Sequence, residues 1–312
     1  MIKEVNVLSV NISEQKGTIK KPVESIQLRS IGVVGDAHTG NWHRQVSLLA
    51  KESIDIFSAA AKREISFGEF AENITTEGII LYQTAPLDKF TFGDLELEVT
   101  QIGKTCHGDN CNIFKELGNC VMPKEGIFCR VIKDGDLKAG DILMYHPRVI
   151  KTMIITLSDR ASKGEYEDKS GPLAEKLCEE FYLSRNRHFK IEKHIIPDRE
   201  QELSKLLYKA KKEGFDIVFT TGGTGIGPKD ITPEVVDKHI TKQIPGIMEL
   251  IRVKYGMNKA NALLSRGIAG VMDQTLIYTL PGSPKAVKEY CGEIFKTIEH
   301  SLYMLNELDL HA

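Results

Sequence analysis

The chain has 312 residues, of which 41% are hydrophobic and 27% charged, and its formal net charge is -2. At roughly 100–200 residues per domain, this length predicts two domains, each with enough apolar content for its own core. The absence of a basic excess disfavours nucleic acid as a partner. No stretch approaches the ~20 apolar residues of a membrane helix, and the N-terminus lacks the apolar run of a signal peptide, so we expect a cytoplasmic protein with reduced thiols.

Residues 1–146 are predicted to form a first domain made mostly of short strands. Strand-like runs cover residues 5–10, 95–100 and 127–132, and the last of these precedes a Lys-Asp-Gly-Asp turn. One helix is expected at 48–62. Many short strands separated by turns favour a β-barrel-like domain.

Residues 147–312 are predicted to form a second domain, in which strands and helices alternate. The expected strands are 149–157, 189–196, 216–220 and 276–280, and the expected helices are 172–181, 200–212, 247–254 and 284–305. The last helix has one apolar face, with Ser283 as a candidate N-cap and Pro284 in its first turn. Alternation of this kind predicts a three-layer α/β domain with a mostly parallel sheet.

Polar or glycine-rich segments follow each predicted strand of the second domain. They are residues 158–160, 197–199, 221–230 and 281–285. Because parallel strands end at one edge of the sheet, these segments are expected to meet where open α/β folds bind ligands. The glycine spacing fits neither a Walker loop nor a Rossmann fingerprint, so phosphate binding and a structural turn remain equally good interpretations.

Two carboxylates stand out in these segments. Asp198 and Asp230 are candidate Mg²⁺ ligands, although taken alone each also fits a turn residue or a helix start. Arg160, Lys229 and Lys285 are cations that either balance phosphate charge or lie on the surface.

Ordered motifs then identify a resemblance. The segments TLSDRAS (156–162), GEYEDKSGP (164–172), TTGGTGIGPKDITP (220–233) and LPGSPK (280–285) are similar to the MogA/MoaB-type molybdopterin adenylyltransferase family, which includes the molybdopterin-binding domain of gephyrin. The resemblance spans most of residues 149–305. It implies transfer of AMP from Mg-ATP to molybdopterin, and a homotrimer.

The resemblance also implies site residues. Asp198 and Asp230 correspond to the catalytic acidic pair that positions Mg²⁺, and no nucleophilic side chain is required. The implied substrate and nucleotide set is Ser158, Asp159, Arg160, Thr221, Gly222, Gly223, Thr224, Gly225, Pro281, Gly282, Ser283 and Lys285.

The first domain carries its own polar motifs, at residues 34–38, 42–47, 67–75 and 104–111. They indicate a pocket with His, Arg and thiol groups, in which a cysteine near cations is a candidate thiolate. Zinc is the alternative interpretation, with ligands drawn from Cys106, His107, Cys111, Cys120 and Cys129. The C-x4-C-x8-C-x8-C spacing lacks the paired knuckles of common zinc sites, and Cys129 lies in an apolar strand where a core role is expected.

These motifs resemble the MOSC domain over approximately residues 1–145, most clearly at 67–79 and 103–111. The resemblance implies a β-barrel-like fold, molybdenum cofactor binding and sulfur transfer through one cysteine. Cys106 is the first choice for that position and Cys111 the alternative. His38, Arg44 and Asn73 are expected to line the pocket.

The combined interpretation is an enzyme of molybdenum cofactor biosynthesis whose partners include molybdenum insertion proteins or molybdoenzymes. One alternative is a non-catalytic carrier of molybdopterin or molybdenum cofactor. Another is an unrelated nucleotide or phosphate enzyme on the same scaffold, because a fold alone does not determine function.

Overall fold

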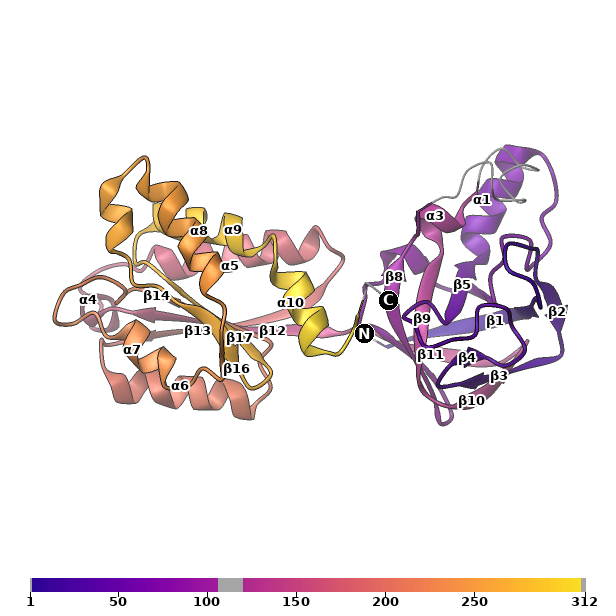
Figure 1. Ribbon diagram of the computed structural model, residues 1–312, viewed down its shortest axis with the longest axis horizontal. Helices are drawn as coiled ribbons and strands as arrows, with labels where there is room; N and C mark the ends of the chain where they lie inside the picture. Colours follow the sequence, from indigo (N-terminus) through magenta and orange to yellow (C-terminus); the bar gives the residue numbers. More distant parts are fainter. Residues whose placement is uncertain (1, 106–119, 310–312) are drawn as a thin grey trace. The chain divides into compact units, whose positions relative to one another are not determined.

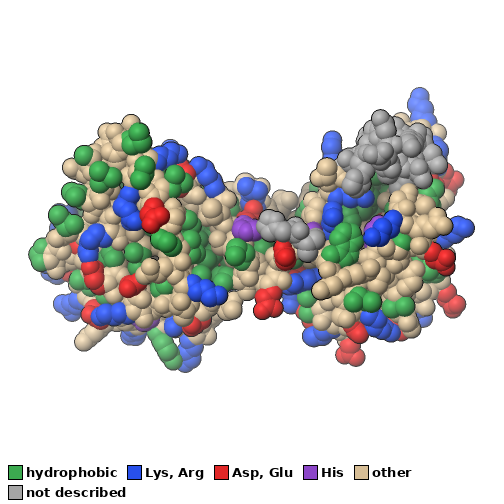
Figure 2. All heavy atoms as spheres, viewed as in Figure 1, with side chains coloured by type: hydrophobic (Ala, Val, Ile, Leu, Met, Phe, Trp, Pro, Cys, Tyr) green, Lys and Arg blue, Asp and Glu red, His purple; other side chains and the backbone are tan. Residues whose placement is uncertain are grey.

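The structure is a computed structural model that describes residues 2–105 and 120–309. It divides into two compact units, Val149–Glu307 and the residues up to Arg148 together with those after Glu307 (Figure 1). On the face drawn in Figure 2, lysine and arginine side chains are interspersed with aspartate and glutamate. None of the helices in the described ranges is long and apolar enough to cross a membrane.

The N-terminal unit is mostly β-structure. Its strands are β1 (Lys3–Ile12), β2 (Lys21–Val23), β3 (Ser25–Arg29), β4 (Gly32–Val33), β5 (Val46–Ala50), β6 (Ile74–Glu77), β7 (Lys89–Phe92), β8 (Leu95–Ile102), β9 (Ile127–Lys133), β10 (Gly135–Lys138) and β11 (Ile142–His146). Its helices are α1 (Lys51–Ala61), the 3₁₀ turn η1 (Leu81–Gln83) and the short α3 (Met122–Glu125).

Seven of these strands close into a barrel, which confirms the predicted fold of this half. The order β11-β7-β8-β9-β5-β6-β1 returns to its start because β1 also pairs with β11. Only β5 and β6 in this ring run parallel; the other pairs are antiparallel. Strands β10, β3 and β4 form a separate three-stranded sheet.

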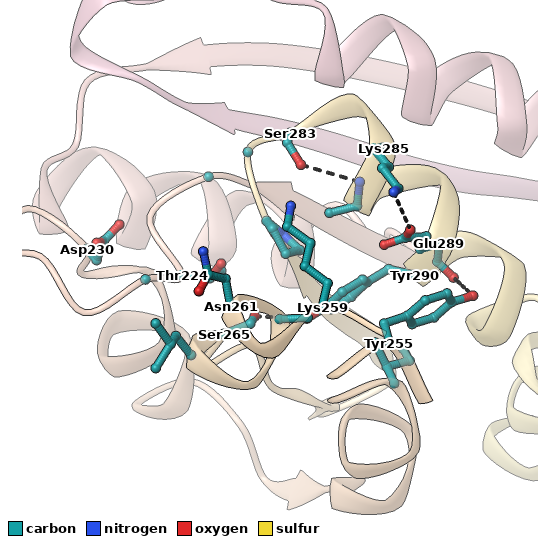
Figure 3. Close-up of a pocket in the computed structure, with 18 of the residues that line it drawn as sticks. Thr224, Asp230, Tyr255, Lys259, Asn261, Ser265, Ser283, Lys285, Glu289 and Tyr290 are labelled. Carbon is teal, nitrogen blue, oxygen red and sulfur yellow. Dashed lines mark hydrogen bonds and ion pairs between the residues drawn. The ribbon is translucent and has the colours of Figure 1, made fainter. Parts of the chain in front are cut away.

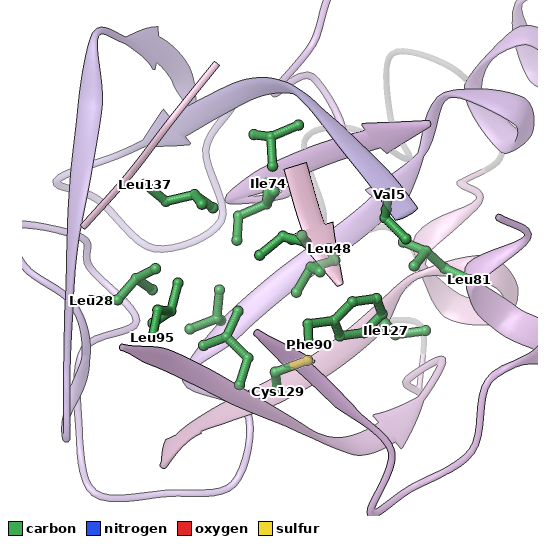
Figure 4. Packing of buried hydrophobic residues seen from close by; sticks show 14 of the residues in the cluster. Val5, Leu28, Leu48, Ile74, Leu81, Phe90, Leu95, Ile127, Cys129 and Leu137 are labelled. Atoms are coloured by element: carbon green, nitrogen blue, oxygen red, sulfur yellow. The ribbon is translucent and has the colours of Figure 1, made fainter. Parts of the chain in front are cut away.

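Alternating apolar side chains fill the barrel interior. Val5, Leu48, Leu97 and Cys129 come from four different strands and are fully buried in one cluster, part of which is drawn in Figure 4. Burial raises the pKa of the Cys129 thiol well above its usual range. Cys129 is therefore a core residue, as expected from its apolar strand.

The C-terminal unit alternates strands and helices. Its strands are β12 (Val149–Leu157), β13 (His188–Ile196), β14 (Ile217–Thr221), β15 (Lys242–Gln243), β16 (Ala269–Met272) and β17 (Thr275–Leu280). Its helices are α4 (Asp159–Ser162), α5 (Ser170–Leu183), α6 (Glu200–Lys212), α7 (Thr232–Asp237), α8 (Pro245–Gly256), the 3₁₀ segment η3 (Ala260–Leu264), α9 (Pro284–Ile294) and α10 (Ile298–Leu305).

The sheet order is β13-β12-β14-β17-β16-β15, with the first four strands parallel and the last two antiparallel. Helices α5, α8, α9 and α10 pack on one face around Ile154, Phe219 and Tyr278. Helices α6 and α7 pack on the other face, around Met153 and Val218. Neighbouring strand residues are apolar on both faces because both are covered. The three-layer α/β prediction is confirmed.

Two predicted helices differ from the structure. Residues 46–50 form strand β5, so the helix expected at 48–62 begins only at Lys51. The helix expected at 284–305 is interrupted at Phe295–Thr297, where the Thr297 hydroxyl donates to the Ile294 carbonyl over 3.0 Å. Such a local side-chain bond competes with the helical ladder. The apolar stripe of α9 and α10 still packs in one core.

Candidate active site

The four predicted loops leave the C-terminal sheet at one level. Leu157 at the end of β12 lies opposite Ile196 of β13, and Thr221 of β14 lies opposite Leu280 of β17. Thr156 of β12 also pairs with Thr221 of β14, so all four strand ends lie at the same level of the sheet. The segments that follow these strands therefore share the carboxyl edge of the sheet, where open α/β folds bind ligands.

A cavity of about 450 Å³ opens at this edge (Figure 3). The sequence-predicted residues that line it are Gly222, Gly223, Thr224, Gly225, Asp230, Pro281, Gly282, Ser283 and Lys285. They come from the loops after β14 and β17. Its size lies within the 300–1,000 Å³ typical of small-molecule sites.

The loop after β14 requires glycine at two successive positions. Gly222 and Gly223 have φ values of 95° and 64°, which side chains rarely adopt. A Cβ on Gly222 would also lie 2.4 Å from the Leu157 carbonyl oxygen, and one on Gly282 would lie 3.3 Å from the Gly222 Cα. The absence of side chains thus lets the two loops approach each other and leaves their backbone exposed to the cavity.

Arg266 makes several hydrogen bonds to the glycine loop that follows β14. Its guanidinium donates to the Gly225 carbonyl over 2.6 Å and to the Asp230 carbonyl over 2.7 Å, and it also pairs with Glu234. Its backbone N–H donates to the Thr224 carbonyl over 2.9 Å. These bonds determine where the Asp230 carboxylate lies relative to the cavity.

Three carboxylates and one lysine gather next to the loop. The Asp198 carboxylate accepts a hydrogen bond from the Asp159 N–H over 3.0 Å, and the Asp159 carboxylate accepts one from the Asp198 N–H over 3.3 Å. Lys229 reaches Asp159 over 2.5 Å. Burial raises the pKa of Asp198, and the nearby charges of Asp159 and Asp230 add to this rise. The Asp230 carboxylate accepts from the Gly227 N–H over 2.7 Å.

Asp159 and Asp198 do not line this cavity, and neither do the other predicted residues, Ser158, Arg160 and Thr221. Ser158 caps α4 by accepting from the Ala161 N–H. Arg160 is exposed and stacks on Tyr166 at 5.3 Å. Thr221 is fully buried, and its hydroxyl lies 3.3 Å from that of Thr156. These positions support the loops that carry the cavity residues.

Sequence reasoning missed the opposite wall. Tyr255, Lys259, Asn261 and Ser265 line it from α8 and the segment after it, and Tyr290 from α9 donates to the Ser265 hydroxyl over 2.8 Å (Figure 3). None of them follows a parallel strand, so an argument from strand ends does not reach them.

Comparisons with known proteins match each half of the chain to a family. Residues 153–300 match the model of a probable molybdopterin binding domain, and residues 35–144 match that of the MOSC domain. A molybdopterin adenylyltransferase from Helicobacter pylori is 39% identical over 153 residues, 49% of this chain and 85% of that protein. The chain belongs to the molybdopterin adenylyltransferase family.

Other relatives extend the same match. A molybdopterin adenylyltransferase from Pyrococcus furiosus is 36% identical over 165 residues, which are 50% of this chain and 93% of that protein. Gephyrin from Dictyostelium discoideum is 33% identical over 163 residues, 49% of this chain and 22% of that protein. The adenylyltransferase half thus places the chain in molybdenum cofactor biosynthesis, and the MOSC match covers the barrel strands from β5 to β9 and most of β11.

The MOSC half contains a smaller cavity of about 110 Å³. His38, Arg44 and Asn73 line it together with Trp42 and Lys104. Cys106 and Cys111, the two candidate thiols, lie outside the described residues. Cys178 and Cys291 of the adenylyltransferase half are buried in its core, and burial raises the pKa of Cys291 to about 12.

No group of three or more His, Cys, Asp or Glu side chains within residues 2–105 and 120–309 is arranged to hold a metal ion. The zinc alternative draws on Cys106, His107 and Cys111, which lie outside these ranges. A magnesium ion near Asp198 and Asp230 would take further ligands from substrate phosphates, as Mg²⁺ commonly does.

Proposed function

We propose that the C-terminal half adenylylates molybdopterin with Mg-ATP. The observation that carries the proposal is a cavity at one sheet edge that is lined by the glycine loop, the N-terminus of α9 and Asp230, with Asp198 next to Asp230. It lies in the half of the chain that is 39% identical to a molybdopterin adenylyltransferase over 153 residues. In this reaction the terminal phosphate oxygen of molybdopterin forms a bond to the α-phosphorus of ATP. The bond between the α-phosphorus and the bridging oxygen breaks, and pyrophosphate leaves.

The acidic cluster is suited to a divalent cation. Asp198 is partly buried beside Asp159 and Asp230, and its pKa is raised mainly by burial, with a further contribution from these two negative charges. Lys229 pairs with Asp159, which leaves Asp198 and Asp230 as the pair to hold Mg²⁺. The bound ion would neutralise phosphate charge and align the reacting groups.

The loops supply the other phosphate contacts. Backbone near Gly222 and Gly223 is bare of side chains, and α9 begins at the cavity with Ser283 as its N-cap. A helix N-terminus favours an anion, and Lys285 lies beside it on the cavity wall. These groups hold the molybdopterin phosphate, while Tyr255, Asn261 and Ser265 offer a mixed apolar and polar wall to the pterin ring.

Self-association is also part of the proposal. Leu250 and Val253 on α8, Met257 just after it, and Leu263 and Leu264 on the adjacent η3 are 52–83% exposed. A group of large apolar side chains on a soluble domain is typical of a protein interface. Together with the family resemblance it supports a homotrimer, and sedimentation velocity checks this mass directly.

For the MOSC half we propose molybdenum cofactor binding or sulfur transfer, with Cys106 or Cys111 as the thiol. The adenylylated product then passes to a molybdenum insertion protein or a molybdoenzyme.

An assay of the complete reaction distinguishes an adenylyltransferase from a non-catalytic carrier of molybdopterin. The purified chain is incubated with molybdopterin, ATP and Mg²⁺, and pyrophosphate and adenylylated molybdopterin are quantified. Equimolar formation of both products, dependent on all three components, supports the enzyme. Binding of molybdopterin without pyrophosphate release contradicts it and favours a carrier.

A further inference from the structure

The small cavity of the MOSC half has an unbalanced set of charges. Its described lining contains three side chains that can be cationic, His38, Arg44 and Lys104, and no aspartate or glutamate. The remaining lining residues are Trp42, Ser47, Ala71, Asn73, Met122 and Phe128. A wall of this kind favours an anion.

Arg44 is held by aromatic rings rather than by a carboxylate. Its guanidinium carbon lies 4.9 Å from the centre of the Trp42 ring and 6.0 Å from that of Phe128. Its Nε is buried and has no hydrogen-bond acceptor within the described part of the chain. A buried donor without an acceptor costs free energy, so this one is suited to a ligand that supplies the missing oxygen.

The Asp36 carboxylate beside His38 already has a cationic partner. Asp36 pairs with Lys20 over 2.7 Å, and both side chains are 1% exposed. Burial alone would raise the pKa of Asp36, but hydrogen bonds from His38 and Lys20 hold this pKa well below its usual value. The same carboxylate lies 3.3 Å from His38 Nδ1, which orients the imidazole and leaves Nε2 for a ligand.

Asn73 has a supporting role. Its amide donates to Asp36 over 3.1 Å and to the Asn11 carbonyl over 3.2 Å, and its side-chain oxygen accepts from the Ser47 N–H and hydroxyl. Because both N–H bonds of its amide group already have acceptors, Asn73 positions neighbouring residues of the cavity wall and does not bind the ligand itself.

The cavity volume limits what can enter. About 110 Å³ is well below the 300–1,000 Å³ of sites for drug-sized molecules. A volume of this size suits a five-atom tetrahedral anion, and a larger ligand would place only its anionic group in the cavity.

We propose that this cavity is an oxyanion site that binds a tetrahedral anion of phosphate size, with Arg44 and Lys104 as charged donors. The anion is either free in solution or the terminal phosphate of a larger molecule. The site does not depend on adenylylation by the other half.

Trp42 makes the site directly observable. It is the only tryptophan in the chain and it contacts Arg44. The full chain is titrated with inorganic phosphate at constant ionic strength, with chloride as the control anion, and tryptophan emission is recorded. A saturable change with phosphate but not with chloride supports the site. Emission that is unchanged up to tens of millimolar phosphate overturns it.

Variants link the response to the proposed donors. Arg44→Gln is expected to weaken phosphate binding at least tenfold, since it removes a charge-assisted contact. Arg29→Gln removes an arginine of the same unit that pairs with Asp136, and is expected to leave binding unchanged. Lys104→Gln provides a second test should Arg44→Gln fail to fold. Parental affinity in both Arg44→Gln and Lys104→Gln contradicts the proposal.

Two further experiments identify the kind of anion that binds and test whether the site is independent of the other half. Glycerol phosphate is titrated as a phosphomonoester: tighter binding than inorganic phosphate assigns the site to the phosphate of a larger molecule, and weaker binding assigns it to a free anion. Asp230→Ala, which removes the proposed Mg²⁺ ligand of the other half, is expected to leave the Trp42 titration unchanged. A Trp42 response lost in Asp230→Ala contradicts an independent site.

Discussion

The candidate active-site cavity and the proposed oxyanion site are built from different parts of the polypeptide. In the adenylyltransferase half, glycine backbone at strand ends forms the wall, and positive φ values at Gly222 and Gly223 shape it. In the MOSC half, charged and aromatic side chains form the wall, supported by the buried pair of Lys20 and Asp36. The first cavity should be sensitive to added side-chain atoms and the second to the loss of a charge.

Breaking the buried pair is expected to have the largest effect. Asp36→Ala leaves Lys20 buried without its counter-charge, which should destabilise the MOSC half by about 3–5 kcal/mol. Urea unfolding followed by Trp42 emission measures this loss. The double variant Lys20→Met with Asp36→Leu should recover part of the stability, because no buried charge remains although Asn73 and the His38 N–H lose their acceptor. A loss below about 1 kcal/mol in Asp36→Ala would show that the pair does not support the cavity.

Adding one methyl group tests the glycine wall. Gly222→Ala combines an unfavourable positive φ with a clash against the Leu157 carbonyl, so we expect a loss of about 3 kcal/mol and of adenylylation. Gly164→Ala is the matched control, because φ is 74° there but no atom lies within 4 Å of the added carbon. It should cost only about 1–2 kcal/mol and retain activity. Equal effects at the two positions would contradict the close approach of the loops.

Glu72 provides a pH-dependent contrast within the MOSC half. It is fully buried, and burial raises its pKa from 4.5 to about 7. Because the folded pKa is raised, its contribution to stability is complete below pH 4.5 and is lost as the pH rises through 7. Glu72→Gln should therefore be more stable than the parent at pH 8, by about 3 kcal/mol, and similar at pH 4.5. If the free energy of unfolding changes with pH in the same way in the parent and in Glu72→Gln, the raised pKa of Glu72 is contradicted.

The smallest effect is expected at Arg266, which positions the glycine loop without lining the cavity. Arg266→Gln should lower adenylylation about tenfold and raise the Mg²⁺ concentration needed for half-maximal activity, because the Asp230 backbone loses a donor. Arg266→Lys should restore part of the activity. An unchanged Mg²⁺ requirement in Arg266→Gln, whatever the loss of stability, would assign Arg266 a purely structural role.

Sequence patterns predicted the parts that depend on local order. The ends of strands and the segments that follow them can be identified from the local sequence. Because parallel strands end at one edge of a sheet, the loops carrying Asp198, Gly223 and Ser283 could be predicted to lie at the same edge. Other features depend on contacts between segments that are distant in the sequence, so no local sequence pattern indicates them. They are the hydrogen bonds from Arg266 to the glycine loop, the cavity wall at Tyr255 and Lys259, and the Lys20–Asp36 ion pair. The interruption at Thr297 was missed because the apolar periodicity continues through it.

The most direct test measures pyrophosphate released from ATP and molybdopterin by the Asp198→Ala and Asp230→Ala variants at saturating Mg²⁺. Both carboxylates belong to one cluster at the sheet edge, so removal of either should abolish turnover while thermal unfolding stays close to that of the parent chain. Release at the parental rate by either folded variant would contradict the assignment of that carboxylate to the Mg²⁺ site.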